Sequence, residues 1–172
     1  MRLSATSKVS PTTTRDCSGS CHLDDDTVVL DRINTWTGTS EHPVQISDVE
    51  TWLTQASATY HSVTVILDPW QAIGLAQRLK RRRIRVEEYT FSAPSVGRFA
   101  TTVHLFLREH RLALPQDAQL LDELANVRLR ETSPGVYRMD HDPDKHDDQA
   151  IALALAANHL ITRPEKRQWR AY

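Results

Sequence analysis

Three carboxylates in the chain have neighbours that suit the binding of a metal ion. Asp147 and Asp148 are adjacent, and they directly precede the apolar, helix-forming residues 150–157. Two adjacent like charges repel, and each costs free energy when it is partly buried beside a core helix. A hard divalent cation would relieve both costs, because such cations take carboxylate oxygens as ligands. Asp68 ends the run 63–67, which has the pattern of a buried strand. The sequence therefore predicts that an acid at a strand end and an acid pair at a helix start converge on one metal, as in a nuclease site.

Each of these acids also has an ordinary structural explanation. Asp68 precedes Pro69 and Trp70, so it could simply cap the helix that begins there. Acids at a helix start complement the helix dipole, which would account for one member of the Asp147–Asp148 pair. A pair is more than capping requires, and the metal interpretation is favoured there, whereas the two interpretations of Asp68 stay open.

A dense basic cluster, Lys80, Arg81, Arg82 and Arg83, ends the helix that follows Asp68. Cations at a helix C-terminus are commonly explained by the helix dipole. The functional alternative is contact with DNA phosphates, which would neutralise charge on the nucleic acid. The cluster is too far from Asp68 along the helix to take part in catalysis.

Patterning along the chain predicts an α/β layered domain. The expected strands are 27–36, 62–67 and 84–89, with a hairpin over 128–139, and the expected helices are 47–59, 70–82, 94–110, one from 115 and one that begins at the acid pair. Ser47 and Glu50 have the spacing of a capping box for the first helix.

Composition excludes several classes of protein. The 172 residues carry a net charge of -1, so any binding to nucleic acid must come from local patches. No apolar run is long enough to span a membrane, and no glycine pattern forms a phosphate-binding loop. Cys17 and Cys21 with His22 do not complete a zinc site, and we interpret them as incidental cysteines in a reducing cytoplasm.

The chain is expected to have three parts. Residues 1–23 are rich in Ser and Thr and poor in large apolar side chains, so they are predicted to be disordered or poorly packed. Residues 24–161 form the folded domain, and residues 162–172 are a basic C-terminal tail.

With these residues in view, the chain resembles the C-terminal nuclease domain of phage terminase large subunits, the motors that package DNA. The resemblance covers about residues 24–161. The segments that carry it are Trp36 to Gly38, VILDP at 65–69, residues 79–86, LALP at 112–115, and His146-Asp147-Asp148 before the Ala-Leu helix.

The resemblance implies an RNase H-like mixed sheet flanked by helices. It also implies a two-ion site for Mg²⁺ or Mn²⁺ that hydrolyses phosphodiester bonds of double-stranded DNA, with Asp68, Asp147 and Asp148 as the matching metal ligands. The implied partners are DNA and a portal protein or small terminase subunit, with no membrane. The implied location is the cytoplasm of a host cell, with a phage or prophage gene as the source.

Two departures from the family limit this expectation. The family's first catalytic Asp lies on the first strand, whereas the corresponding part of this chain, residues 10–21, has no apolar strand pattern and offers only Asp16. The first strand is therefore expected to be missing or degraded. The family's ATPase domain is also absent, which suggests a truncated gene. We expect impaired cutting, and the alternative is a non-catalytic remnant that binds DNA or a packaging subunit.

Overall fold

A six-stranded mixed sheet forms the centre of the protein, with the strand order β5-β4-β1-β2-β3-β6. The computed structural model describes residues 2–6, 15–61, 63–90, 92–134, 136–140 and 146–162. The strands of this sheet are β1 (Arg2–Thr6), β2 (Arg15–Asp24), β3 (Thr27–Thr37), β4 (Thr64–Leu67), β5 (Arg85–Glu88) and β6 (Leu112–Ala113). Strand β2 runs antiparallel to both β1 and β3, whereas β4 is parallel to β1 and β5.

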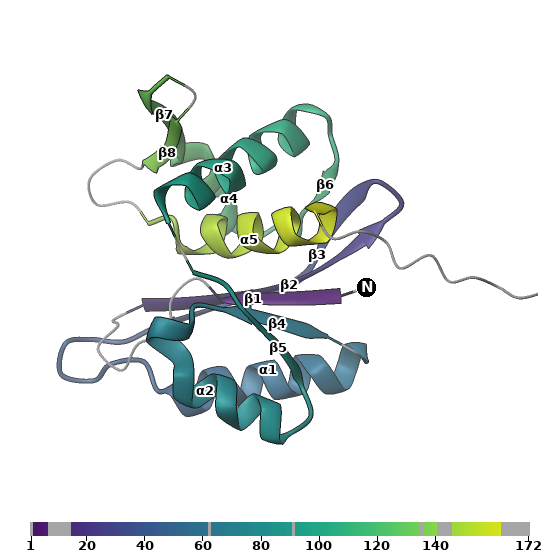
Figure 1. The fold of residues 1–172 in the computed structure, drawn as a ribbon, viewed down its shortest axis with the longest axis vertical. Coiled ribbons are helices and arrows are strands. Elements are labelled where there is room, and N and C mark those ends of the chain that lie inside the picture. Colours follow the sequence, from purple (N-terminus) through teal and green to yellow (C-terminus); the bar gives the residue numbers. More distant parts are fainter. Residues whose placement is uncertain are drawn as a thin grey trace, which may run out of the picture.

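Helices cover both faces of the sheet, so the domain has three layers (Figure 1). The helices are α1 (Ile46–Tyr60), α2 (Pro69–Arg81), α3 (Ala93–Arg108), α4 (Ala118–Asn126) and α5 (Asp148–Thr162). Helices α1 and α2 lie on one face, and α3, α4 and α5 lie on the other, next to the hairpin of β7 (Arg128–Ser133) and β8 (Val136–Asp140). None of the helices in the described part of the chain is long and apolar enough to cross a membrane.

Each face of the sheet has its own hydrophobic core, because strand side chains alternate between faces. In β4, Ile66 packs with Leu153 and Leu155 of α5, whereas Val65 and Leu67 pack with α1 and α2. This alternation buries β4 on both sides, as its continuous apolar pattern predicts.

Strand β2 corrects, for residues 15–23, the prediction that residues 1–23 are disordered or poorly packed, whereas residues 7–14 of that segment lie outside the described residues. Residues 16–21 are all buried, and β2 pairs with a neighbour on each side. The segment was missed because its buried side chains are small rather than apolar: Ser18, Gly19 and Ser20 lie between Cys17 and Cys21. Small side chains leave room for the Ala-rich helix α5 to approach this strand closely.

Strand β1 is present, so of the two alternatives predicted for the first strand, missing or degraded, the first is wrong. It lies in the middle of the sheet, with Leu3 opposite Thr64 of β4 and Cys21 of β2. Its sequence, RLSAT, has no run of apolar residues and no carboxylate. The strand is therefore present in the sheet, and it carries no carboxylate.

The other elements follow the sequence-based expectations closely. Strands β3, β4 and β5, all five helices and the β7–β8 hairpin form where they were expected. The predicted capping box at Ser47 and Glu50 is wrong, because helix α1 begins at Ile46 after Gln45. The side chain of Glu50 instead forms ion pairs with Arg78 and Arg82. The predicted tail lies outside the described residues, apart from Thr162.

Candidate functional site

Asp68 lies at the carboxyl end of β4, directly before the first residue of α2, as the sequence predicts. Its backbone carbonyl accepts a hydrogen bond from the N–H of Ala72 at 3.2 Å. Ile66, two residues earlier in the alternation of β4, belongs to the core on the α5 side of the sheet. The carboxyl ends of parallel strands are the usual place for ligand sites in open α/β sheets, so the position of Asp68 fits a site.

The acid pair lies at the start of α5. Asp148 is the first helical residue and its side chain is buried, whereas Asp147 is partly exposed. His146 approaches the same acid, with its Nδ1 atom 4.0 Å from Oδ2 of Asp148. Asp148 therefore lies at the buried helix end that the apolar sequence after it predicts.

Glu123 of α4 holds this helix start in place. Its Oε2 atom accepts hydrogen bonds from the backbone N–H groups of Gln149 at 2.7 Å and Ala150 at 3.2 Å. These N–H groups belong to the first turn of α5, which has no earlier carbonyl to bind. The side chain of Gln149 also donates to Thr35 of β3 at 2.8 Å. The start of α5 is thus tied to both α4 and the sheet.

Arg15 joins the two buried acids. Its Nη2 atom lies 2.5 Å from Oε1 of Glu123, and its Nε atom lies 3.5 Å from Oδ2 of Asp148. The Arg15 side chain is 12% exposed, and those of Glu123 and Asp148 are 3% and 4% exposed. We refer to Arg15, Glu123 and Asp148 as the acid–arginine cluster.

Two members of this cluster, Arg15 and Glu123, were not predicted from the sequence. Arg15 was assigned to the disordered segment, and Glu123 was not singled out because Leu120, Leu121 and Leu124 surround it in the sequence. In the structure Glu123 is buried and Leu121 is 48% exposed. The sequence does contain one indication that Glu123 is buried, which is its position within three residues of several leucines on a short amphipathic helix. Nothing in the sequence near Arg15 marks it as a partner.

Burial raises the pKa of three side chains in this part of the structure. It raises the pKa of the Glu123 carboxyl above its ordinary value of 4.5, an effect that the Ala150 and Gln149 N–H groups and Arg15 oppose. Burial also raises the pKa of the Cys17 and Cys21 thiols far above their ordinary 9.0. Both cysteines are buried on β2 rather than in a mobile segment, so they are core residues.

The structure does not assemble the predicted metal ligands into a metal site. Among the residues that it describes, no group of three or more His, Cys, Asp and Glu side chains could hold a metal ion. Asp68, Asp147 and Asp148 therefore do not form such a group, and Asp148 is ion-paired with Arg15 instead. Asp16 is buried on β2 and belongs to no such group among the described residues.

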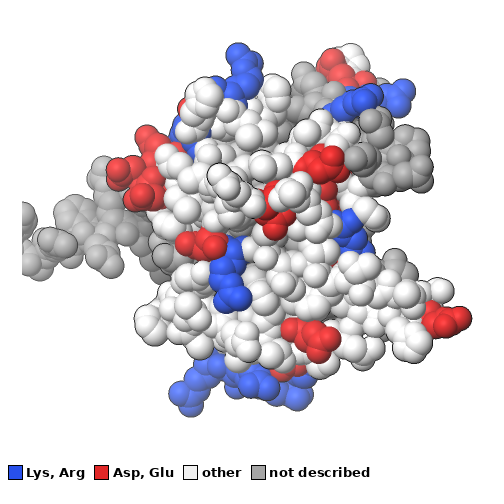
Figure 2. All heavy atoms as spheres, turned by 180° about the vertical axis from the view of Figure 1, so that it is seen from behind, with Lys and Arg blue, Asp and Glu red and all other residues white. Residues whose placement is uncertain are grey.

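The predicted DNA-contact cluster divides into paired and unpaired cations. Lys80 lies 2.7 Å from Glu88, and Arg82 shares Glu50 with Arg78. Arg81 and Arg83 form no ion pair within the described ranges. Lys and Arg side chains gather at the lower edge of the molecule, below the centre of Figure 2, on the side where α2 ends.

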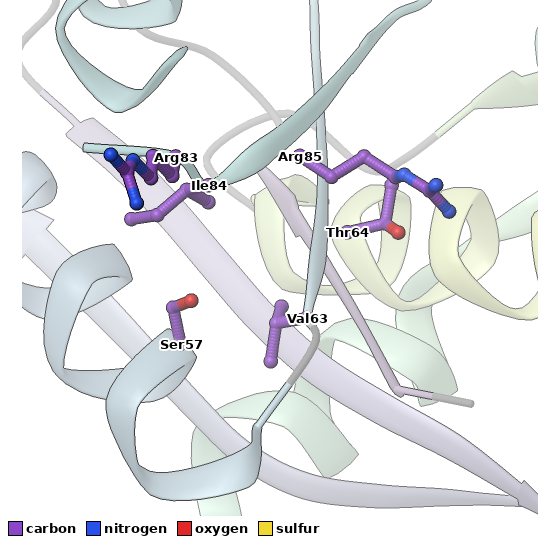
Figure 3. A pocket seen from close by; sticks show the side chains of 6 residues that line it. All are labelled: Ser57, Val63, Thr64, Arg83, Ile84 and Arg85. Carbon is purple, nitrogen blue, oxygen red and sulfur yellow. The ribbon is translucent and has the colours of Figure 1, made fainter. Parts of the chain in front are cut away.

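A pocket of about 380 Å³ lies beside this cluster, at the end of β4 opposite Asp68. Arg83 and Arg85 stand on either side of it, with Ser57, Val63, Thr64 and Ile84 forming the rest of the wall (Figure 3). Thr64 and Arg85 are the paired first residues of β4 and β5. The pocket and Asp68 are thus at opposite ends of β4.

The strand order, the antiparallel β1–β2–β3 unit beside the parallel β1–β4–β5 unit, and helices on both faces define an RNase H-like domain. The more particular likeness is to the large subunit of phage terminases. The chain is 31% identical over 134 residues to the large terminase subunit of Thermus virus P23-45, covering 75% of this chain and 25% of that protein. It is 30% identical over 113 residues to the large terminase subunit of Thermus phage G20c, covering 64% of this chain and 23% of that protein.

Solved structures give the same result for the fold. The chain matches the Thermus phage P74-26 large terminase nuclease domain with a TM-score of 0.69 at 24% identity, over 90% of this chain and 78% of that one. The magnesium-bound G20c large terminase nuclease matches with a TM-score of 0.71 at 22% identity, over 91% and 81%. The HK97 bacteriophage large terminase matches with a TM-score of 0.76 at 11% identity, over 92% and 39%.

The resemblance to a terminase nuclease domain is therefore confirmed by sequence and by fold. The chain spans about a quarter of the length of the curated relatives that it matches. No protein-family profile matches the sequence.

Proposed function

We propose that this chain acts on double-stranded DNA during phage DNA packaging, as a terminase-type nuclease domain that binds DNA and cuts it poorly or not at all. One observation carries the second half of the proposal. Asp148, which matches the family's acid at the last helix, is paired with Arg15 and is not grouped with Asp68 and Asp147. The absence of a carboxylate from β1 supports the same conclusion.

The metal requirement implied by the family is a separate question for this chain. The G20c nuclease has been crystallised with bound magnesium, cobalt and zinc. In this chain the described residues do not fit such an ion, so we assign no hydrolytic step to a metal. Asp68, Asp147 and Asp148 remain the proposed ligands for any residual cutting that depends on Mg²⁺ or Mn²⁺.

Plasmid nicking tests the cutting half of the proposal. We expect the purified chain to give little or no nicking with Mg²⁺ and at most a trace with Mn²⁺, which accepts the same oxygen ligands. The double variant Asp68→Asn, Asp148→Asn should remove any trace without unfolding the domain. Robust nicking by the intact chain with Mg²⁺ would show that the proposal of impaired cutting is wrong. Nicking that survives the double substitution would mean that these acids are not the site.

The DNA-binding half rests on the unpaired cations. Of the predicted contacts Lys80, Arg81, Arg82 and Arg83, the structure favours Arg81 and Arg83, because the other two already have carboxylate partners. Arg85 lies on the far side of the pocket from Arg83, and its guanidinium has no ion pair with any of the described residues. Arginines that flank a polar hollow are suited to successive phosphates of a DNA strand.

Fluorescence anisotropy with duplex DNA in the presence of a chelator tests this half. The double variant Arg83→Ala, Arg85→Ala should bind more weakly and should lower the slope of log affinity against log salt by about 2. Lys80→Ala is the matched control and should change little, since Lys80 is already paired with Glu88. If the control weakens binding as much as the double variant, the assignment of the contact is wrong. Contact with a portal protein or small terminase subunit, and action in the host cytoplasm, remain predictions.

A further inference from the structure

The acid–arginine cluster contains its own cation, Arg15, beside the two acids Glu123 and Asp148. Glu123 and Asp148 are almost fully buried, and ionised carboxylates are costly to bury without a cation. In relatives of this fold a divalent ion is the expected cation. Here the guanidinium of Arg15 lies against both carboxylates, at 2.5 Å from Glu123 and 3.5 Å from Asp148.

We propose that Arg15 is the resident cation of this site and that it excludes divalent metal ions from Asp148. A guanidinium is always charged, so the one side chain can donate a hydrogen bond to Glu123 and lie within ion-pair distance of Asp148. The site would then bind Mg²⁺ or Mn²⁺ appreciably only after the arginine is removed, which accords with at most a trace of cutting by the intact chain.

The contacts of Glu123 mean that small side-chain movements would not open the site to a metal ion. One of its oxygens is paired with Arg15, and the other accepts the N–H groups of Gln149 and Ala150. A metal ion would need oxygen ligands at about 2.0–2.6 Å. Glu123 could turn toward such an ion only by releasing the first turn of α5.

The position of Arg15 is equally constrained. It is the first residue of β2 and pairs with Thr37 of β3, so the sheet sets where its side chain begins. Cys17, two residues along the same strand face, is fully buried. The ion pair therefore arises from the contact of the sheet with α4 and α5, and not from an exposed loop.

This inference rests on the proposed function only in taking Asp148 as the acid of the last helix, and its test needs no DNA. The thermal midpoint of the full chain is measured with and without millimolar MnCl₂, and bound Mn²⁺ is counted by electron paramagnetic resonance. The wild-type protein should show no Mn²⁺-dependent shift that Asp148→Asn removes. Arg15→Gln should lower the midpoint by about 5–15 °C and should regain about 5 °C or more when Mn²⁺ binds.

Arg111→Gln is the matched control. Arg111 pairs with Asp26 and Glu109 at a more exposed place, so its loss should create no response to Mn²⁺. Arg15→Lys covers the case in which the glutamine variant does not fold, since it keeps the charge but loses the planar set of donors. The lysine variant should show a smaller Mn²⁺ response than the glutamine variant.

Two results would overturn the inference. One is Mn²⁺ binding by the wild-type protein that disappears in Asp148→Asn, because the site would then already accept a metal. The other is the absence of a Mn²⁺ response in both Arg15 variants, because the acids would then not be a latent cation site. Neither result depends on whether the wild-type protein nicks plasmid, so a failure of this inference is distinguishable from a failure of the proposed function.

Discussion

Replacing Glu123 with alanine should detach the start of α5 from α4. The substitution removes the acceptor for the N–H groups of Gln149 and Ala150 and leaves Arg15 with one acid partner fewer. A hydrogen bond to a charged group contributes about 1.5–3 kcal/mol, and removing one partner of a buried pair costs about 3–5 kcal/mol. The alanine variant also removes the free-energy cost of burying the Glu123 carboxylate, which is the cause of its raised pKa, and this offsets part of the loss. We therefore expect a decrease of about 3–5 kcal/mol in the free energy of unfolding.

Urea unfolding followed by circular dichroism measures this change. Glu123→Gln keeps a carbonyl oxygen that can accept from the same amides, so it should lose less, about 1–2 kcal/mol. Gln119→Ala, at an exposed position of the same helix, is the control and should stay within about 0.5 kcal/mol of the wild-type protein. Hydrogen exchange at Gln149 and Ala150 should accelerate in the alanine variant. A loss below about 1 kcal/mol for Glu123→Ala, or equal losses for alanine and glutamine, would refute the anchoring role.

Three further predictions concern the core and protonation. Cys17 and Cys21 should not react with a thiol reagent such as Ellman's reagent until the protein unfolds, because both are fully buried with strongly raised pKa values; rapid reaction of the folded protein would contradict their placement on β2. Leu153→Ala should cost about 2–5 kcal/mol in urea unfolding, since this side chain is fully buried between α5 and the sheet. The raised pKa of Glu123 means that the folded state holds a proton there more readily than the unfolded state. The stability of the wild-type protein relative to Glu123→Gln should therefore be highest below about pH 4.5 and should fall as pH rises through the folded pKa, as urea titrations at several pH values would measure.

The parts of the fold that the sequence predicts are those with a repeating apolar pattern. Strand β4 is continuous and β-branched, and helix α5 is rich in Ala and Leu, so both form where they were expected. Strand β2 was not predicted, because the buried side chains there are small. Serines such as Ser18 and Ser20 are typical of loops when the sequence alone is considered. Strand β1 is too short and too polar to stand out, and only its pairing with β2 and β4 makes it a strand.

The candidate site was predictable only where its residues carry a local pattern. Asp147 and Asp148 stand out because an acid pair before an apolar helix is unusual, and Asp68 stands out at the end of a buried strand. Arg15 and Glu123 are 108 positions apart in the chain, and their ion pair depends entirely on the packing of α4 against the sheet. The local sequence therefore gave no sign that Arg15 pairs with these acids, and the acids considered alone suggested a metal ion.

The location of the acid–arginine cluster also bears on the order in which the domain assembles. Strands β2 and β3 are joined by a tight turn at Asp25 and Asp26, so this hairpin can form from neighbouring residues. Strand β1 pairs with β4 only after the chain closes a loop of roughly sixty residues, which is a slower, non-local step. The cluster needs Arg15 from the hairpin and Asp148 from the last helix, so it exists only once α5 has docked. Its ion pairs are thus expected among the last contacts to form in folding, and a chain released before α5 is complete would expose Arg15 and Glu123 without the third member of their cluster.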